Sequence, residues 1–256
     1  MIKTALTIAG SDPSGGAGFQ ADIKTFSAMG VYGMAIPAAL TAQSTSGVTA
    51  VREVYPAFLE AQLDTLLSDI VPDALKTGML LSARTMRVVA AAVRKYRLNN
   101  LVVDPVMVSS TGARLMRKNA FDTLVGELLP LAELVTPNID EAVRLSGMSI
   151  EDPEDMEEAA RRIQALGPRF VLVKGGHLGG EPIDVFYNGK EIFRFHGKRV
   201  SGKKLHGTGC VYSAAITAGL AKGMSAMEAI ANAKEFVTKA IRKAEPVGKG
   251  RLPLWL

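Results

Sequence analysis

The sequence predicts an α/β protein in which helices cover both faces of a central, mostly parallel sheet. Short apolar runs that are typical of buried strands alternate along the chain with stretches of helical periodicity. No long linker, low-complexity stretch or internal repeat interrupts this alternation. We therefore expect a single domain over residues 1–256 rather than two.

Six apolar runs are the candidates for the strands of the parallel sheet. They cover residues 5–9, 35–41, 74–76, 101–104, 134–136 and 170–174. After the sixth run the pattern changes to two strand-like segments, 183–187 and 191–195, around the pair Asn188-Gly189. Because Asn-Gly favours a tight turn, these two segments predict an antiparallel hairpin at an edge of the same sheet.

Helices are predicted between the strands by apolar side chains that recur three or four positions apart. Two such stripes consist of Phe19, Ile23, Phe26 and Met29, and of Leu59, Leu63, Leu66, Leu67 and Ile70. Asp152-Pro153 indicates the start of a helix that Gly167 ends, and Ser225 with Glu228 has the spacing of a capping box for the final helix.

The composition describes a globular protein with a large apolar core. Of 256 residues, 48% are hydrophobic and 21% are charged. No apolar run approaches the roughly 18 residues of a membrane-spanning helix, and the apolar start at residues 5–9 is too short for a signal peptide. The one cysteine excludes an internal disulfide and a multi-cysteine metal site, which agrees with a reducing compartment. We expect a cytoplasmic protein.

The charge pattern argues against nucleic acid and membrane surfaces as partners. The 30 Lys and Arg residues outnumber 25 Asp and Glu residues, for a formal charge of +5. The basic residues are dispersed, and aromatic residues make up only 6%, which is too few for an evident base-stacking platform. A modest positive balance suits an enzyme with polyphosphate ligands.

The motif His206-Gly207-Thr208-Gly209-Cys210 precedes a small, apolar segment and predicts a helix N-terminus that holds phosphate. Two glycines let the backbone approach an anion, and free N–H groups together with the helix dipole favour negative charge. On this first turn we expect the pKa of Cys210 to be lowered, so that the residue acts as a base or nucleophile. Taken alone, the motif also fits a glycine-rich turn with a buried cysteine.

A second glycine-rich loop, residues 10–18, follows the first strand. It is not a Walker A loop, because Gly16 and Ala17 stand where lysine and Ser or Thr are needed. Residues 16–21 fit a dinucleotide-binding fingerprint, which offers a rival function. The second strand ends at Gln43 without the carboxylate that such a site uses, and this weakens the rival.

Two polar residues near this loop are candidates for substrate binding. The amide of Gln43 can donate and accept hydrogen bonds, as the ring nitrogen and amino group of a flat heterocycle require, or it is a solvated loop residue. Asp22 lies one turn into the first helix, where it either faces the same pocket or stabilises the helix dipole from the surface.

Further polar motifs follow the later strands, where open α/β sheets bind their ligands. These motifs are residues 76–79, 104–107, 136–141 and 174–177. Asp104 and Glu141 are hard oxygen ligands suited to Mg²⁺, and Lys174 could accompany a nucleotide phosphate. Each carboxylate alone could be a helix cap or a solvated loop residue, whereas together they indicate phosphoryl transfer.

Seven collinear motifs together resemble those of the hydroxymethylpyrimidine/phosphomethylpyrimidine kinases of thiamine biosynthesis, which belong to the ribokinase-like superfamily. The motifs are residues 9–18, 40–43, 76–79, 103–107, 136–138, 174–177 and 206–210. The resemblance extends from about residue 5 to the tail at 248–250. It implies a single α/β domain, a homodimer, ATP with Mg²⁺, and two successive phosphorylations. The first acts on the hydroxymethyl group of 4-amino-5-hydroxymethyl-2-methylpyrimidine and the second on the resulting monophosphate.

The same resemblance implies roles for individual residues. The residues implied to line the pyrimidine pocket are Gly10, Asp22, Gln43 and Met79. Those implied to serve Mg²⁺ and phosphate are Asp104, Asn138 and Glu141. Gly207, Thr208 and Gly209 would form the anion hole, and Cys210 stands where sugar-kinase relatives carry an aspartate base.

Three positions depart from the usual pattern of the family and bear on substrate preference. Ser44 replaces a frequent asparagine, and Leu205 and Val211 each replace a frequent threonine. A related branch of the superfamily phosphorylates pyridoxal, so a pyridoxal kinase is the alternative function. A non-catalytic nucleotide- or vitamin-binding protein is a further alternative.

Overall fold

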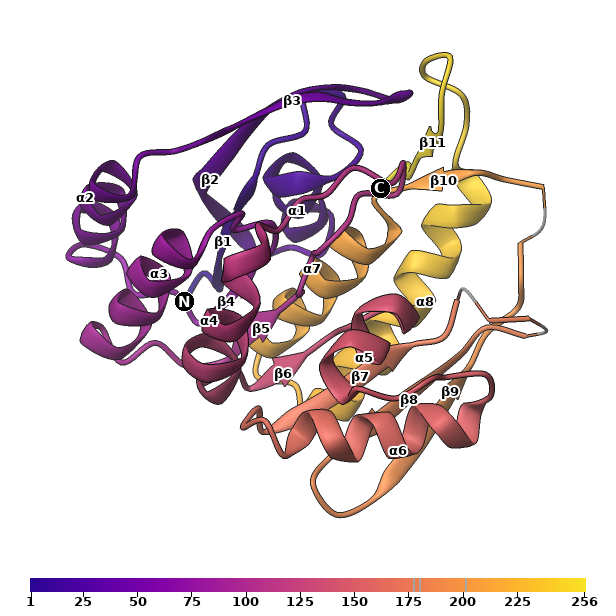
Figure 1. The fold of residues 1–256 in the computed structure, drawn as a ribbon. Coiled ribbons are helices and arrows are strands. Elements are labelled where there is room, and N and C mark those ends of the chain that lie inside the picture. Colours follow the sequence, from indigo (N-terminus) through magenta and orange to yellow (C-terminus); the bar gives the residue numbers. More distant parts are fainter. Residues whose placement is uncertain (177, 180, 201) are drawn as a thin grey trace.

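The computed structural model describes residues 1–176, 178–179, 181–200 and 202–256 (Figure 1). Its main sheet has nine strands in the order β3-β2-β1-β4-β5-β6-β7-β8-β9. The strands from β2 to β7 in this order run parallel. At the edges, β3 pairs antiparallel with β2, and β8 and β9 form an antiparallel pair beside β7. The predicted α/β class and the predicted edge hairpin are confirmed.

The strands of the main sheet are β1 (Thr4–Gly10), β2 (Tyr32–Ser44), β3 (Gly47–Glu53), β4 (Ala74–Thr77), β5 (Leu101–Val103), β6 (Leu134–Val135), β7 (Phe170–Lys174), β8 (Ile183–Tyr187) and β9 (Ile192–His196). The main helices are α1 (Gly18–Ala28), α2 (Pro56–Leu67), α3 (Ala83–Lys95), α5 (Ile139–Ser146), α6 (Pro153–Gln164), α7 (Thr208–Ala221) and α8 (Ala226–Lys243). A short helical segment joins β5 to β6 and comprises η1 (Lys118–Ala120), α4 (Phe121–Thr123), η2 (Leu124–Leu128) and η3 (Leu129–Leu131).

Two apolar layers form because successive side chains of a strand point to opposite faces of the sheet. On one face, Ala5 and its neighbours pack against α1, α7 and α8, and Figure 1 shows α7 beside α8. On the other face, Leu6 and Ile8 pack against α2, α3, α5 and α6. The sheet is therefore buried on both sides. No helix in the described part of the chain is long and apolar enough to span a membrane.

The predicted helix signals have the expected positions. The Asp152 side chain caps α6 by accepting a hydrogen bond from the Asp155 N–H, with Pro153 on the first turn. Ser225 and Glu228 form the predicted capping box of α8. From the first apolar stripe Phe26 is fully buried, as is Leu59 from the second.

Some elements differ from the sequence prediction. The second strand is longer than residues 35–41 because it continues into a hairpin with β3, a strand with many exposed side chains and hence no apolar run. Helices α3 and α5 were not assigned in the sequence. A separate two-stranded sheet pairs β10 (Leu205–His206) with β11 (Leu252–Pro253).

The tail that contains β11 ties together segments around the carboxyl ends of the strands. The Arg251 N–H donates to the Thr45 carbonyl at 2.9 Å, and the Gly250 N–H donates to Thr45 Oγ1 at 3.1 Å. Thr45 lies in the turn between β2 and β3. This tail therefore connects the β2–β3 hairpin to the strand that leads into α7.

Candidate active site

The turn that begins α7 has the backbone geometry of an anion site. Gly207 is the N-cap with φ +79°, and no side chain caps the helix, so the first-turn N–H groups have no side-chain acceptor. A Cβ atom at Gly207 would lie 1.7 Å from the Gly16 carbonyl oxygen. Glycine is required by the left-handed φ and by this contact. Thr208, Gly209 and Cys210 line a large cavity, so the turn is placed to receive an anion.

The expected lowering of the Cys210 pKa is wrong for this structure. Burial of the sulfur raises the pKa to about 11, although the Lys76 ammonium and a hydrogen bond from the Gly18 N–H lower it in part. The carboxylates of Asp22 and Asp104 add to the upward shift. A helix N-terminus alone does not decide the charge of this thiol, because desolvation of a thiolate outweighs it. The resting residue is a neutral thiol.

The glycine-rich loop after β1 is organised by Asp12. One carboxylate oxygen accepts from the Ser14 N–H at 3.0 Å, and the other accepts from the Ala17 N–H at 2.8 Å. His206 Nε2 lies 2.7 Å from Asp12 Oδ2, so the loop is joined to the anion turn. Burial raises the pKa of Asp12, but the hydrogen bonds with His206 and Ser14 outweigh it and lower the pKa below 3.8.

His206 is the point at which this loop meets two further segments. The Nε2 atoms of Gln43 and His206 are 3.2 Å apart, and His206 Nδ1 lies 3.1 Å from Ser110 Oγ. Because a carboxylate only accepts, the His206 Nε2 that faces Asp12 carries a proton. The Gln43 side-chain NH2 is also a donor, so its approach to Nε2 is a packing contact and not a hydrogen bond. The imidazole therefore joins the anion turn to Asp12 and Ser110, with Gln43 packed beside it.

A narrow cavity of about 60 Å³ contains the residues implied to bind the pyrimidine. Gly10, Asp22, Gln43 and Met79 all line it, together with Cys210. A Cβ atom at Gly10 would lie 2.0 Å from the Met79 methyl group, so these two residues form one closely packed wall. Asp22 is not at the surface: it is fully buried, and its Oδ1 accepts from Lys76 Nζ at 2.8 Å. The surface interpretation of Asp22 is wrong.

The dinucleotide-binding interpretation of residues 16–21 gains nothing from the loop's geometry. Gly18 begins α1, and a Cβ atom there would lie 2.5 Å from the Gly10 carbonyl oxygen. The loop thus closes on itself around Asp12, and β2 ends at Gln43 and Ser44 without a carboxylate.

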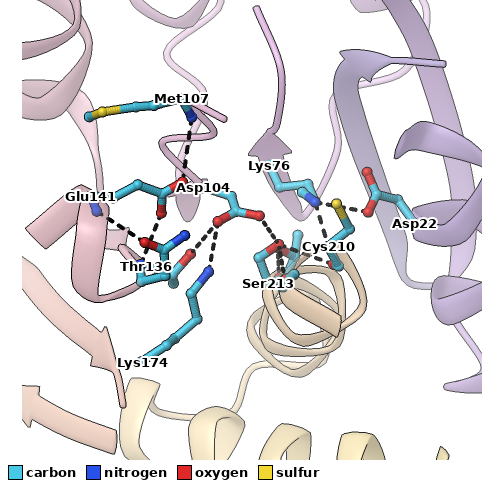
Figure 2. A network of polar contacts seen from close by, with 12 residues as sticks. Asp22, Lys76, Asp104, Met107, Thr136, Glu141, Lys174, Cys210 and Ser213 are labelled. Atoms are coloured by element: carbon cyan, nitrogen blue, oxygen red, sulfur yellow. Dashed lines mark hydrogen bonds and ion pairs between the residues drawn. The ribbon is translucent and has the colours of Figure 1, made fainter. Parts of the chain in front are cut away.

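Asp104 lies at the centre of a buried polar network (Figure 2). Its Oδ1 accepts from Lys174 Nζ at 2.9 Å, and its Oδ2 accepts from Ser213 Oγ at 3.2 Å. Burial raises the pKa of Asp104, but the positive charges of Lys174 and Lys76 and the hydrogen bonds keep it below the ordinary value. Asp104 is therefore a buried carboxylate, not a solvated loop residue.

Asn138 and Glu141 form a capping box at the start of α5. The Glu141 N–H donates to Asn138 Oδ1 at 3.0 Å, and the Asn138 N–H donates to Glu141 Oε2 at 2.9 Å. Burial is the main cause that raises the pKa of Glu141 to about 7. The positive charge of Lys174 lowers this pKa in part, and the negative charge of Asp104 raises it further. The cap interpretation of Glu141 is correct, and the same residue also lines the large cavity.

The large cavity has a volume of about 910 Å³ and is lined by Asp104, Asn138, Glu141 and Lys174 with the anion turn. Basic side chains at its wall include Lys198, Lys204 and Arg251. His177, the last residue of the 174–177 motif, lies outside the described residues. The two cavities share five lining residues: Ala17, Val106, Ser109, His206 and Cys210. Two ligands, one in each cavity, would therefore meet at the first turn of α7.

Asp104 and Glu141 are suitable ligands for a metal ion that binds only one or two protein side chains. Among the described residues no three His, Cys, Asp or Glu side chains cluster as a metal site. Asp104 and Glu141 interact electrostatically and both face the large cavity. Mg²⁺ commonly uses one or two carboxylates and completes its shell with water and substrate phosphates. The pair is thus a suitable donor set for Mg²⁺ with a polyphosphate, although not for a metal held by the protein alone.

Several residues of the site received no individual role from the sequence, although Asp12, Lys76 and His206 belong to the motifs it identifies. Lys76, Ser213, Asp12 and His206 contribute side chains whose partners lie far away in the chain. Asp184 accepts hydrogen bonds from the Gly175 N–H, Tyr212 and Lys234 at the wall of the large cavity. The polar Lys76 inside an otherwise apolar strand was the available signal for that residue.

A parallel α/β sheet with a polyphosphate-sized cavity and a small acceptor pocket, joined at a helix N-terminus, defines an α/β small-molecule kinase. The chain belongs to the phosphomethylpyrimidine kinase family, whose model matches residues 12–255. The expected family and the ribokinase-like fold are both confirmed.

Among curated relatives, the chain is 46% identical over 258 residues to the hydroxymethylpyrimidine/phosphomethylpyrimidine kinase of Rhizobium meliloti, covering 99% of this chain and 97% of that protein. It is 50% identical over 252 residues to the thiamine biosynthesis bifunctional protein ThiED of Geobacter sulfurreducens. That match covers 98% of this chain but only 51% of the relative, about half its length.

Solved structures resemble the whole fold. Phosphomethylpyrimidine kinase from Clostridium difficile is 42% identical with a TM-score of 0.84, covering 93% of this chain and 99% of that one. An ADP complex of Bacillus subtilis pyridoxal kinase is 39% identical with a TM-score of 0.91, covering 99% and 97% of the two chains.

Proposed function

We propose that this protein is an ATP-dependent kinase of thiamine biosynthesis. It phosphorylates 4-amino-5-hydroxymethyl-2-methylpyrimidine and then the resulting monophosphate. The observation that carries the proposal is the meeting of the large and narrow cavities at Cys210 and His206, beside the anion turn. The names of the relatives from Rhizobium meliloti and Clostridium difficile support the substrate, and the ADP complex of a structural neighbour supports the nucleotide.

In this proposal the nucleotide lies in the large cavity. Lys174 and Asn138 contact its phosphates, and Gly207, Thr208 and Gly209 direct N–H groups to the γ-phosphoryl group. Asp104 and Glu141 would hold Mg²⁺, which supplies charge neutralisation for the phosphates when it is bound.

The pyrimidine lies in the narrow cavity with Gln43 bonded to the ring, and with Gly10, Asp22 and Met79 as its walls. The hydroxymethyl oxygen attacks the γ-phosphorus, a new O–P bond forms, and the bond to the leaving ADP breaks. The hydroxyl proton leaves late in a loose transition state, so a strong base is not required. Cys210 contacts this hydroxyl; because its resting thiol is already protonated, only its thiolate form can accept the proton, which converts it to the thiol. Positioning and electrostatics supply most of the rate.

The remaining features of the proposal concern the whole protein. Residues 1–256 form one kinase domain, which works in the cytoplasm, does not bind nucleic acid, and forms a homodimer. Apolar side chains that a partner subunit could cover are exposed on β2 and at the start of α2: Leu40, Tyr55 and Phe58. Sedimentation equilibrium of the purified protein tests the dimer.

Pyridoxal kinase is the second candidate, because the Bacillus subtilis neighbour with that name has the same fold over 99% of this chain. The test is ADP release with Mg-ATP and, in parallel, the hydroxymethylpyrimidine, its monophosphate or pyridoxal. Turnover of both pyrimidines, with pyridoxal much slower, would support the thiamine-pathway kinase. Turnover of pyridoxal alone would assign the protein to vitamin B6 metabolism, and no turnover with any alcohol would favour a binding protein.

A further inference from the structure

Lys76 and Asp22 form an ion pair that is closed to bulk solvent. Both side chains have 0% exposure, and Lys76 Nζ lies 2.8 Å from Asp22 Oδ1. Thr7 Oγ1 donates to the other Asp22 oxygen at 2.6 Å. Lys76 and Thr7 are paired in register on β4 and β1, so neighbouring strands place both groups under α1 and α7.

Stability alone does not account for such a pair. Desolvating two charges costs several kcal/mol per ion, and apolar residues of similar volume often serve a core as well or better. Both residues also line the narrow cavity, which they share with Cys210. The pair therefore lies in the proposed acceptor pocket and not in an inert part of the core.

The Lys76 ammonium is directed to the first turn of α7. It donates to the Cys210 carbonyl oxygen at 3.5 Å, in addition to Asp22 (Figure 2). An ammonium has three N–H donors, and among the described residues only these two acceptors contact it. The third donor has no acceptor among the described residues.

Charged groups from four elements act on the Cys210 thiol. Lys76 on β4 lowers its pKa, whereas Asp22 on α1 and Asp104 after β5 raise it, with the effect of Lys76 larger than either. Lys174 on β7 also interacts with the sulfur. Lys76 is thus the main positive charge that opposes desolvation of a thiolate at this position.

We propose that Lys76, held by Asp22, is a positioning residue of the transfer step: it fixes the first turn of α7 and controls proton exchange at Cys210. This inference rests on the proposed function, because it assumes that Cys210 meets the substrate hydroxyl. Asp22 contributes by orienting Lys76, in addition to forming a wall of the pocket.

The test is the rate of iodoacetamide alkylation of Cys210, measured against pH in the full-length protein without substrate or nucleotide. Cys210 is the only cysteine in the chain, so the reaction reports one thiol. The thiolate is the reactive form, and below the pKa a one-unit rise slows the reaction about tenfold. Lys76→Met should slow alkylation by roughly threefold or more, and Asp22→Asn should accelerate it.

Each single variant leaves one buried charge without its partner and can fail to fold for that reason. The double variant Asp22→Asn/Lys76→Met removes both charges and avoids this problem. Removing both charges is far milder than removing one. Because Lys76 acts on the thiol more strongly than Asp22, the double variant should still be alkylated more slowly than the wild type. Lys3→Met, which removes an exposed ion pair with Asp73, is the control and should leave the rate unchanged.

A purely structural pair would give the opposite result, since a loosened pocket exposes the thiol and accelerates alkylation. Wild-type or faster alkylation in a folded double variant would overturn the inference. In kinase assays the double variant should lower kcat more than it raises KM. Failure of the wild-type protein to phosphorylate either pyrimidine would instead overturn the proposed function, which separates the two outcomes.

Discussion

His206 Nε2 lies 2.7 Å from Asp12 Oδ2, which connects two loops that are 194 positions apart in the chain. The contact holds the glycine-rich loop after β1 against the turn that begins α7. Gln43 Nε2 lies 3.2 Å from the same imidazole nitrogen, so the residue proposed to bind the pyrimidine ring packs against the side chain that joins the two loops.

The first prediction concerns this imidazole. His206→Ala should raise the KM for the hydroxymethylpyrimidine roughly three- to tenfold, because Gln43 loses the imidazole packed beside it and the glycine-rich loop loses its hydrogen bond to the anion turn. Gln43→Ala should raise KM at least as much and is the matched comparison. Steady-state kinetics with saturating ATP checks both, and an unchanged KM in Gln43→Ala would show that its amide does not bind the pyrimidine ring.

The second prediction concerns acid stability. Asp12 has a folded pKa below 3.8, since hydrogen bonds from His206 and Ser14 outweigh its burial. Its stabilising effect is complete above pH 3.8 and is lost as the pH falls through the folded pKa. Asp12→Asn should therefore lower the free energy of unfolding by about 1–3 kcal/mol at pH 7. Urea titrations should show this difference shrinking as the pH falls below 3.8; a constant difference would contradict it.

The third prediction concerns Cys210. Cys210→Ala should lower kcat roughly a hundredfold or more if the thiol contributes as general bases usually do. Cys210→Ser places a hydroxyl where the thiol was, which can still contact the substrate, so its kcat should fall less than that of Cys210→Ala. Single-turnover assays measure the transfer step directly. Near-normal turnover of the alanine variant would remove the residue from the mechanism.

The fourth prediction compares two glycines with similar backbone angles. Gly207 and Gly223 have φ values of +79° and +85°, but only at Gly207 would a Cβ atom meet another backbone atom, the Gly16 oxygen. Gly223→Ala should lower the free energy of unfolding by about 1–2 kcal/mol, because alanine is strained in the left-handed backbone conformation. Gly207→Ala should cost clearly more and abolish phosphoryl transfer. Equal unfolding free energies for both variants, measured by urea titration, would show that the contact with Gly16 relaxes.

Much of the fold was predictable because the parallel strands are buried on both faces and therefore appear as apolar runs. The β2–β3 hairpin was not predicted, since β3 exposes many of its side chains and is a sheet edge. Helix caps at Asp152 and Ser225 depend on nearby residues only, and the prediction of each was confirmed.

The site was predictable in its composition and less so in its electrostatics. Residues at strand ends meet because parallel strands end at one edge, which brings Asp104 to Lys174. The charge of Cys210 depends instead on burial and on Lys76, which lies 134 positions earlier in the chain. No local pattern contains that information, and helix position alone led to the wrong direction for its pKa.

The pairing of β10 with β11 has a consequence for how the protein is made. His206 is aligned with Pro253, so the segment beside the anion turn receives its strand partner only after 47 further residues, 207 to 253, have been translated. At roughly 5–20 residues per second, this delay amounts to a few seconds on the ribosome. During that interval the nascent chain already contains every residue of the phosphate-binding turn, yet the strand that braces it has not been synthesised.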